Sequence, residues 1–466
     1  MRARLLKLVD TLLRNFWFLP GLMMAGGIGL YLLADAFNTS HWVRVLQRNG
    51  VIYSGGFAEA QTILTVIAQT MVAIASLSFA TVAVVLTLAT SQFGHRLVRS
   101  FMRDKPTQFA FGIFVTTFIY ALLVLYAVSD AGAGAAVPGL SVSIAFYLAV
   151  TAGATLIYFT HHIAQMIAAP SVIAEVGEEM DLTIDRAWPP RAGDVRHTID
   201  AEAMQAVRRQ LDDDSVVVHC AGPGYIQTLD TTGLTILATE CDVVIEMLRR
   251  PGDYLFDGTP IARVSPSRRC DRKLAGKVRQ SMVIGKHRTP VQDLRFAFNQ
   301  IAEIAVRAMS PALNDPFTAL DCVNRIGAGI GRLAVREEPS AFQCDANGQV
   351  RLIIEPVGFE EVVGAAFTPV RNYSRESVIV TLQMLHALRE LAPRLQNGDQ
   401  RRAVALQAAL IRRGADEGLS EAHDRLSAQE AYQSVLRNLR ICEADLPPAR
   451  QICLNMTQAH KQGRSP

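Results

Sequence analysis

A run of 35 residues, Ala60–Gly94, contains no Asp, Glu, Lys or Arg side chain. As an α-helix such a run is about 52 Å long, whereas the hydrocarbon core of a bilayer is about 30 Å thick. A helix that is apolar on every face is stable only when lipid or a large protein core surrounds it. The run therefore predicts a transmembrane helix that tilts, kinks or extends beyond the membrane.

Three further apolar stretches accompany this run. The four expected membrane helices cover about residues 16–34, 62–91, 107–129 and 137–159, and crossing a bilayer takes about 20 residues. Residues 1–169 contain only 10 basic and 5 acidic side chains, whereas the other 297 residues contain 36 and 38. The sequence therefore predicts a membrane protein with a four-helix transmembrane bundle at 1–169, followed by a cytoplasmic α+β domain.

Positive charges set the expected orientation, because loops rich in Lys and Arg stay in the cytoplasm. Four such residues precede the first span and four lie between the second and third, but only two lie between the first and second. Both termini are therefore expected in the cytoplasm.

All seven cysteines follow residue 169, without a C-x-x-C pair or metal-ligand spacing. This pattern favours reduced thiols and argues against disulfides and a metal site.

Small and polar side chains recur every three or four residues along the second span, so they share one face of the expected helix. This stripe comprises Thr62, Thr65, Gln69, Ala73, Ser76, Ala80, Ala83, Thr87 and Thr90. Such residues mark helix contacts within a chain or, around a symmetry axis, the lining of a pore. The candidate pore or helix-contact residues are Thr62, Thr65, Gln69, Ser76 and Thr87.

Other features of the spans bear on the class of membrane protein. No acidic, basic or histidine side chain lies deep within any span, which argues against proton relays and coupled transporters. Gly21, Ala25 and Gly29 form a ladder of small residues in the first span and predict packing against another helix.

After Pro170 the pattern becomes amphipathic, and four segments are expected. They are a connecting helix at 170–195, a small β-rich module at 196–265, a mainly helical domain at 266–446 and a polar tail at 447–466. Further helices are expected at Tyr373–Leu391, Asp399–Arg413 and Ser427–Leu439. Asp399 and Ser427 are their expected N-caps, and Gly414 is an expected stop.

Two helices in the mainly helical domain carry clear start signals. Thr289, Pro290 and Gln292 have the spacing of a capping box that opens a helix at Pro290–Ala308. Asp315 before Pro316 predicts the start of the next helix. In one interpretation these residues only cap the two helices. In the other, the chain around both helix starts forms one corner that binds a ligand or has a regulatory role. Basic residues and free helix N–H groups there would favour an anion.

The candidate residues of this corner are Arg288, Thr289, Gln292, Asp293, Ser310, Asn314, Asp315 and Thr318. Thr289 and Asp315 are expected to stabilise the fold as caps. Neither Arg288 nor Asn314 is expected to cap a helix, so their replacement by alanine is expected to leave the melting temperature nearly unchanged.

The sequence contains no P-loop, G-x-S-x-G, H-E-x-x-H or G-x-G-x-x-G motif, so neither enzymatic activity nor a cofactor is expected. No aromatic residues interleave with the basic run at 268–288, and nucleic acid is not an expected partner. The expected partners are the lipid bilayer, further copies of the chain and an anionic ligand at the cytoplasmic domain.

Several short motifs together suggest a family. In order, they are FWFLP at Phe16–Pro20, SQFG at Ser91–Gly94, HHI at His161–Ile163, RTPVQD at Arg288–Asp293 and SPALNDPFTA at Ser310–Ala319. Together they resemble the bacterial predicted-membrane-protein family catalogued as domain of unknown function 2254, over about residues 10–440. His95 stands where the family pattern has proline. The resemblance implies a multi-pass protein of the bacterial inner membrane and supplies no activity or catalytic residue.

The function expected from these observations is a homo-oligomeric gated channel or passive pore for ions or small solutes, controlled by the cytoplasmic domain. The alternative is a membrane-tethered sensor or scaffold whose cytoplasmic domain binds a partner or ligand. Flux through the purified protein in liposomes distinguishes the two.

Overall fold

The computed structural model describes residues 16–38, 52–93, 104–131, 137–166, 168–188 and 201–445. The chain forms two compact units, Met1–Val172 and Ile173–Pro466. Most of the basic residues that set the expected orientation lie outside the described residues, as does the tail at 447–466.

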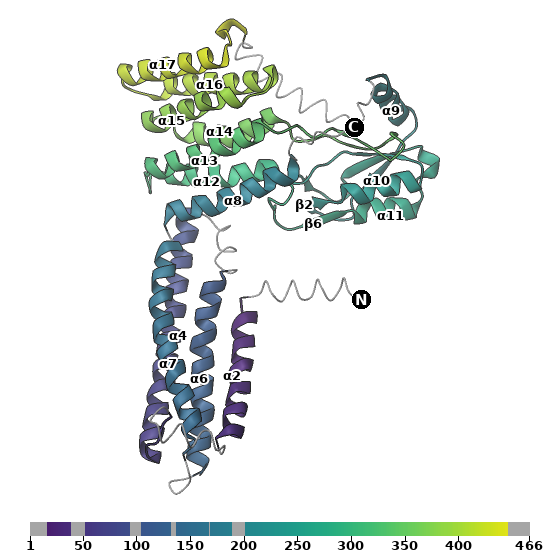
Figure 1. Ribbon diagram of the computed structural model, residues 1–466. Helices are drawn as coiled ribbons and strands as arrows, with labels where there is room; N and C mark the ends of the chain where they lie inside the picture. Colours follow the sequence, from purple (N-terminus) through teal and green to yellow (C-terminus); the bar gives the residue numbers. More distant parts are fainter. Residues whose placement is uncertain are drawn as a thin grey trace. The chain divides into compact units, whose positions relative to one another are not determined.

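The first unit contains, among its described residues, four helices long and apolar enough to cross a membrane. They are α2 (Phe18–Phe37), α4 (Phe57–Phe93), α6 (Lys105–Ala131) and α7 (Gly139–Met166) (Figure 1). All four expected spans are therefore confirmed as helices. The fourth continues past residue 159, so His161 and His162 lie within α7 and not after it.

Helix α6 is the centre of this bundle, because it packs against α2, α4 and α7. Phe114 and Tyr120 of α6 are fully buried. Phe111 and Phe114 pack edge-to-face on Phe159 of α7, with ring centroids 6.1 and 6.5 Å apart. Large aromatic side chains therefore occupy the interior of the bundle.

Helix α2 approaches α6 closely at Gly27. A Cβ atom at Gly27 would lie 2.5 Å from Thr116 Cγ2, so a larger residue does not fit without movement of α6. No atom lies within 4 Å of a Cβ placed at Gly21 or Gly29, and Ala25 is exposed. Among the described residues, the Gly21–Gly29 ladder therefore lies on a face of α2 without a neighbouring helix, and its packing role stays a prediction.

The second unit begins with α8 (Ala169–Ala187) and α9 (Ala201–Asp213) and then contains two sheets. The larger has the order β1 (Val216–His219), β5 (Pro260–Ser265), β3 (Val244–Met247), β8 (Val350–Ile354), β7 (Phe342–Cys344). Only its β3–β8 pair is parallel. The smaller, antiparallel sheet has the order β4 (Tyr254–Leu255), β2 (Gly224–Leu229), β6 (Met282–Gly285).

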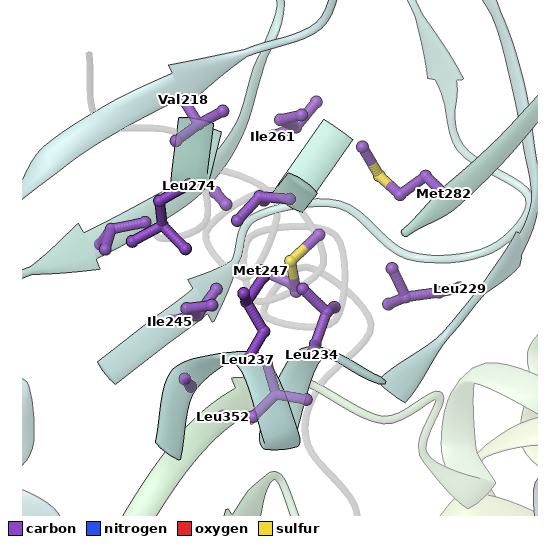
Figure 2. Close-up of a cluster of buried hydrophobic side chains, with 14 of the residues drawn as sticks. Val218, Leu229, Leu234, Leu237, Ile245, Met247, Ile261, Leu274, Met282 and Leu352 are labelled. Carbon is purple, nitrogen blue, oxygen red and sulfur yellow. The ribbon is translucent and has the colours of Figure 1, made fainter. Parts of the chain in front are cut away.

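A hydrophobic core joins the two sheets to α10 (Thr231–Glu240) and α11 (Arg272–Gln280). Figure 2 shows Leu234 and Leu237 of α10 beside Ile245 and Met247 of β3, with Leu352 of β8 in the same cluster. A separate cluster that contains Leu211 of α9 packs on Val244, Val350 and Ile353 of the larger sheet. These two apolar clusters account for the burial of the short strands.

The remainder of the second unit is helical apart from β7 and β8. Its long helices are α12 (Leu294–Ala308), α13 (Pro316–Ala334), α14 (Phe359–Tyr373), α15 (Val378–Leu391), α16 (Gly398–Gly418) and α17 (Ala422–Leu439), and short 3₁₀ helices lie at Ser267–Arg269, Ala392–Arg394 and Glu443–Asp445. Helices α12, α14 and α16 pack in succession, and α13, α15 and α17 form a second succession beside them (Figure 1).

The expected division at residue 265 does not match the sheets. Strand β8 pairs with β3, and β6 pairs with β2, so strands from both sides of residue 265 complete the sheets. The connecting helix is confirmed up to Ala187, and residues 189–200 lie outside the described residues.

Several expected helix starts are corrected by the structure. The helix expected from Pro290 begins at Leu294, with Asp293 as its N-cap. The segment expected as Tyr373–Leu391 contains a break at Ser374, where α14 ends before α15 begins.

The last two helices also begin earlier than expected. Asn397 caps α16 by accepting from the Gln400 amide, so Asp399 lies in the first turn and Gly414 lies within the helix. Helix α17 begins at Ala422, which places Ser427 in its second turn.

Candidate functional site

The stripe of small and polar residues at 62–90, called the α4 stripe from here on, lies on a face of α4 that the described helices leave open. Its exposed members are Thr62, Gln69, Ala73, Ser76, Ala80, Ala83 and Thr87, and its partly exposed members are Thr65 and Thr90. The buried face of α4 consists instead of Ala60, Leu64, Ile67, Ala68, Met71, Ser78, Val85 and Ala89. Among the described residues, the stripe therefore points away from the helices that α4 contacts.

The polar side chains of the stripe differ in how their hydrogen bonds are satisfied. The Thr62, Thr65 and Thr87 hydroxyls donate to the carbonyl oxygens four residues earlier, at 2.8, 2.7 and 2.9 Å. These hydroxyls are therefore compatible with contact with lipid. Gln69 makes no hydrogen bond within the described part of the chain. An amide without partners in hydrocarbon costs several kcal/mol, so Gln69 favours water or a second protein surface.

The interior of the bundle contains hydroxyl groups that sequence reasoning missed. Thr116, Thr117 and Tyr120 of α6 are buried, and their hydroxyl oxygens have no hydrogen-bond partner among the described residues. The sequence signal was available, because three hydroxyl-bearing residues within five positions interrupt an otherwise apolar span. Thr116 faces Gly27 of α2, and the Tyr120 ring packs edge-to-face on Tyr31 of the same helix, with ring centroids 6.4 Å apart.

The first half of the proposed corner is joined to strand β2. The Leu229 amide donates to Gln292 Oε1 at 2.8 Å, and Gln292 Nε2 donates to the Leu229 carbonyl at 3.2 Å. The side chain of Gln292 thus pairs with this backbone as a neighbouring strand would. Thr289 Oγ1 donates to the Gln227 carbonyl at 3.5 Å. Thr289 and Gln292 therefore hold the segment against β2 and do not form a capping box.

Arg288 is directed at the N-cap of α12. Arg288 Nε and Nη2 both donate to Asp293 Oδ2, at 2.9 and 2.6 Å, and the Asp293 side chain is only 1% exposed. Asp293 Oδ1 accepts from the Phe296 amide at 3.0 Å. The Arg288 guanidinium also lies over the Phe296 ring, 4.9 Å from its centre. The Arg288 guanidinium, the Asp293 carboxylate and the first turn of α12 thus satisfy one another's hydrogen bonds without a ligand.

The second half of the corner is a turn that leads into α13. The Asn314 amide donates to the Ser310 carbonyl at 2.9 Å, and Asn314 has a left-handed backbone with φ of 44°. Asp315 accepts from the Thr318 amide at 3.1 Å and from its hydroxyl at 2.6 Å. Hydrogen bonds from Thr318 hold the pKa of Asp315 below its ordinary value. The expected cap at Asp315 is confirmed.

The structure does not bring the two halves together. Segment 288–293 precedes α12 and segment 310–318 follows it, and a helix of 15 residues is about 22 Å long. Among the described residues, no group of three or more His, Cys, Asp or Glu side chains has the arrangement of a metal site. The corner is therefore two separate structural features, one at each end of α12.

Helix α8 contacts both features within the second unit. Asp181 accepts from Arg325 Nη2 of α13 at 2.7 Å. Asp185 accepts from Arg332 of α13 at 2.8 Å and from Arg336, two residues after α13, at 2.5 Å. Thr183 Oγ1 donates to the Pro290 carbonyl at 2.7 Å. Within the second unit, α8 is therefore held against α13 and against the segment before α12.

Comparisons with known proteins identify relatives without an assigned activity. Uncharacterised proteins of Mycobacterium bovis and Mycobacterium tuberculosis are each 27% identical over 423 residues, which cover 90% of this chain and 79% of theirs. No solved structure matches the chain. The model of the family described as predicted membrane protein (DUF2254) matches residues 14–390. The chain therefore belongs to this family of predicted membrane proteins, as the sequence motifs indicated.

Proposed function

We propose that the chain assembles as a homo-oligomer in the bacterial inner membrane, with both termini in the cytoplasm. The α4 stripes of the copies face one another around an axis and line a passive, gated path for ions or small solutes. The unit at 173–466 controls this path.

The observation that carries the proposal is the exposure of the α4 stripe. Its side chains are among those of α4 that α2, α6 and α7 leave uncovered. Gln69 lacks a hydrogen-bond partner in the described part of the chain. The aromatic side chains between α6 and α7 argue against a path through a single bundle. A path between copies satisfies Gln69 with water and buries the small residues against neighbouring helices.

Control by the second unit is proposed to act through α8. This helix is covalently continuous with α7 through residues 167 and 168. Asp–Arg contacts anchor it to Arg325 and Arg332 of α13 and to Arg336 just after α13. A displacement of α13 is therefore expected to move α8 as a rigid element.

Flux measurements on the purified full-length chain in liposomes test the proposal. Wild-type protein is expected to dissipate a potassium or chloride gradient, and Gln69→Leu is expected to reduce the flux several-fold because the path loses a polar group. Thr70→Leu is the matched control, since Thr70 is exposed on the same helix but lies outside the stripe. A monomer without flux, or equal effects of the two substitutions, contradicts the proposal.

The alternative function is a membrane-tethered sensor or scaffold. The ion pairs between α8 and α13 favour a sensor as much as they favour gating. In a sensor, the same contacts would couple binding of a partner at the second unit to α8. A monomeric, non-conducting protein would support this alternative.

A further inference from the structure

A cavity of about 310 Å³ lies between α14 and α16 in the second unit. Thr368, Arg371 and Arg375 line it from the α14 side, and Gln407, Arg413 and Gly414 line it from α16. The stems of the first two arginines lie against Gly414, since a Cβ there would be 3.6 Å from Arg375 Cγ and 4.0 Å from Arg371 Cγ.

Positive charge exceeds negative charge in this cavity. Arg371, Arg375 and Arg413 face two carboxylates, Glu360 and Glu417. Glu417 accepts from Arg413 at 3.0 Å and from Arg375 at 3.4 Å, and Arg371 has no ion-pair partner within 4.0 Å among the described residues. Burial, together with repulsion from Arg375 and Arg413, lowers the pKa of Arg371. One half-buried cation is therefore left without an ion-pair partner, although Glu417 attracts it at longer range.

Two buried hydrogen-bond donors of the cavity also lack acceptors. They are Arg371 Nε and Gln407 Nε2, and Gln407 is only 4% exposed. A buried donor without a partner costs about 1–3 kcal/mol, so natural folds seldom retain two of them in one place. Both groups donate, and a ligand that satisfies them must therefore supply acceptor atoms.

The other walls of the cavity are apolar. Val363, Ala403, Leu406 and Leu410 line it beside the polar groups. Cavities from about 300 Å³ upward hold small organic ligands, and such sites combine apolar walls with a few convergent polar groups. An inorganic ion alone would leave these apolar walls uncovered.

We propose that the α14–α16 cavity binds a small organic anion. Its carboxylate or phosphate accepts hydrogen bonds from Arg371 and Gln407, and its apolar part lies against Val363, Leu406 and Leu410. This site is separate from the segments at 288–293 and 310–318, and it does not depend on whether the α4 stripe lines a path.

Isothermal titration of the full-length chain in lipid nanodiscs tests the proposal. Benzoate and phenyl phosphate are the probes, and the tighter of the two identifies the preferred acid group. Benzyl alcohol is the neutral control. Inorganic phosphate, which has no apolar part, tests whether the apolar walls contribute to binding. We expect at least one of the two aromatic anions to bind, inorganic phosphate to bind more weakly, and benzyl alcohol not to bind.

Two substitutions locate the binding site. Arg371→Met and Gln407→Leu are each expected to weaken binding of the aromatic anion about tenfold or more, as expected for the loss of a charged or buried hydrogen bond. Arg402→Met, at an exposed position of α16 outside the cavity, is the matched control and is expected to bind as wild type does.

Thermal unfolding separates binding from stability. Without ligand, Arg371→Met is expected to raise the melting temperature, because it removes an unpaired, half-buried guanidinium. If Arg371→Met does not fold, Gln407→Leu still tests the site. The proposal is overturned if neither aromatic anion binds at millimolar concentration, if Gln407→Leu binds as tightly as wild type, or if benzyl alcohol binds equally well.

Discussion

Arg288 and Asp293 illustrate how one contact changes the interpretation of a residue. From the sequence, Arg288 was expected to meet a ligand, with no effect on stability when replaced. In the structure its guanidinium donates twice to a carboxylate that is almost fully buried. The positive charge therefore stabilises the N-cap of α12 and is not available for a free anion.

Replacement of Arg288 by alanine is accordingly expected to destabilise the fold by about 1–3 kcal/mol, the cost of a buried acceptor that loses its donor. Thermal unfolding of the full-length chain in detergent measures the loss. Lys286→Ala, at an exposed position two residues earlier, serves as the control and is expected to leave the melting temperature unchanged. Equal melting temperatures for Arg288→Ala and wild type would show that the ion pair is not structural.

Asn314 also has a structural role at the residue scale. Its φ of 44° lies in the left-handed region, which Asn tolerates better than most residues because its short side chain can bond locally. The earlier expectation that Asn314→Ala leaves stability unchanged therefore does not fit the backbone found here. The left-handed backbone of the turn, and not a ligand, explains the choice of Asn.

At the scale of helices, the sequence signals for a helix start were confirmed where no distant part of the chain bonds the capping side chain. Asp230 and Asp315 cap α10 and α13 as their sequences indicate. The signal at Thr289–Gln292 failed because Gln292 bonds the Leu229 backbone, 63 residues away in the sequence. A rule that considers only adjacent residues cannot detect such a partner.

The same reasoning explains what else the sequence could and could not predict. The four apolar spans were predictable, because their length and lack of charge are properties of single segments. The parallel pairing of β3 with β8 was not, since it joins Ile245 to Leu352 across most of the second unit. The α14–α16 cavity likewise depends on how two helices pack, and Arg371 and Gln407 carry no motif that marks them in advance.

The cap of α13 gives a pH-dependent prediction. Because the pKa of Asp315 is lowered by Thr318, ionised Asp315 stabilises the fold above the ordinary carboxyl pKa of about 4. This contribution is lost as the pH falls through the lowered, folded-state pKa.

Asp315→Ala is therefore expected to cost about 0.5–2 kcal/mol at neutral pH. The difference from wild type should be the same at about pH 5 and should shrink below about pH 4, where Asp315 becomes protonated. Melting temperatures across this range measure it, with Asp321→Ala in the same helix as the control. A difference that grows on acidification would contradict the proposed role of the ionised cap.

At the scale of the whole molecule, the two units differ in which surfaces are left uncovered. In the membrane unit, α4 exposes the α4 stripe, and its 37 residues correspond to about 55 Å of helix, longer than the bilayer core. In the second unit, two buried donors without a partner, Arg371 Nε and Gln407 Nε2, lie in one cavity between α14 and α16. The two features lie in different units, so path formation and ligand binding can be tested independently.

The orientation of the molecule is open to a direct test. The excess of Lys and Arg before the first span and between the second and third predicts that the end of α6 near Asp130 faces the periplasm and that α8 faces the cytoplasm. In a chain whose seven cysteines have been replaced, Asp130→Cys is expected to react with a membrane-impermeant maleimide in intact spheroplasts. Glu178→Cys, exposed on α8, is expected to react only after the membrane is permeabilised. The reverse pattern would place the second unit outside the cytoplasm, and the proposed control of the path by a cytoplasmic unit would then have to be abandoned.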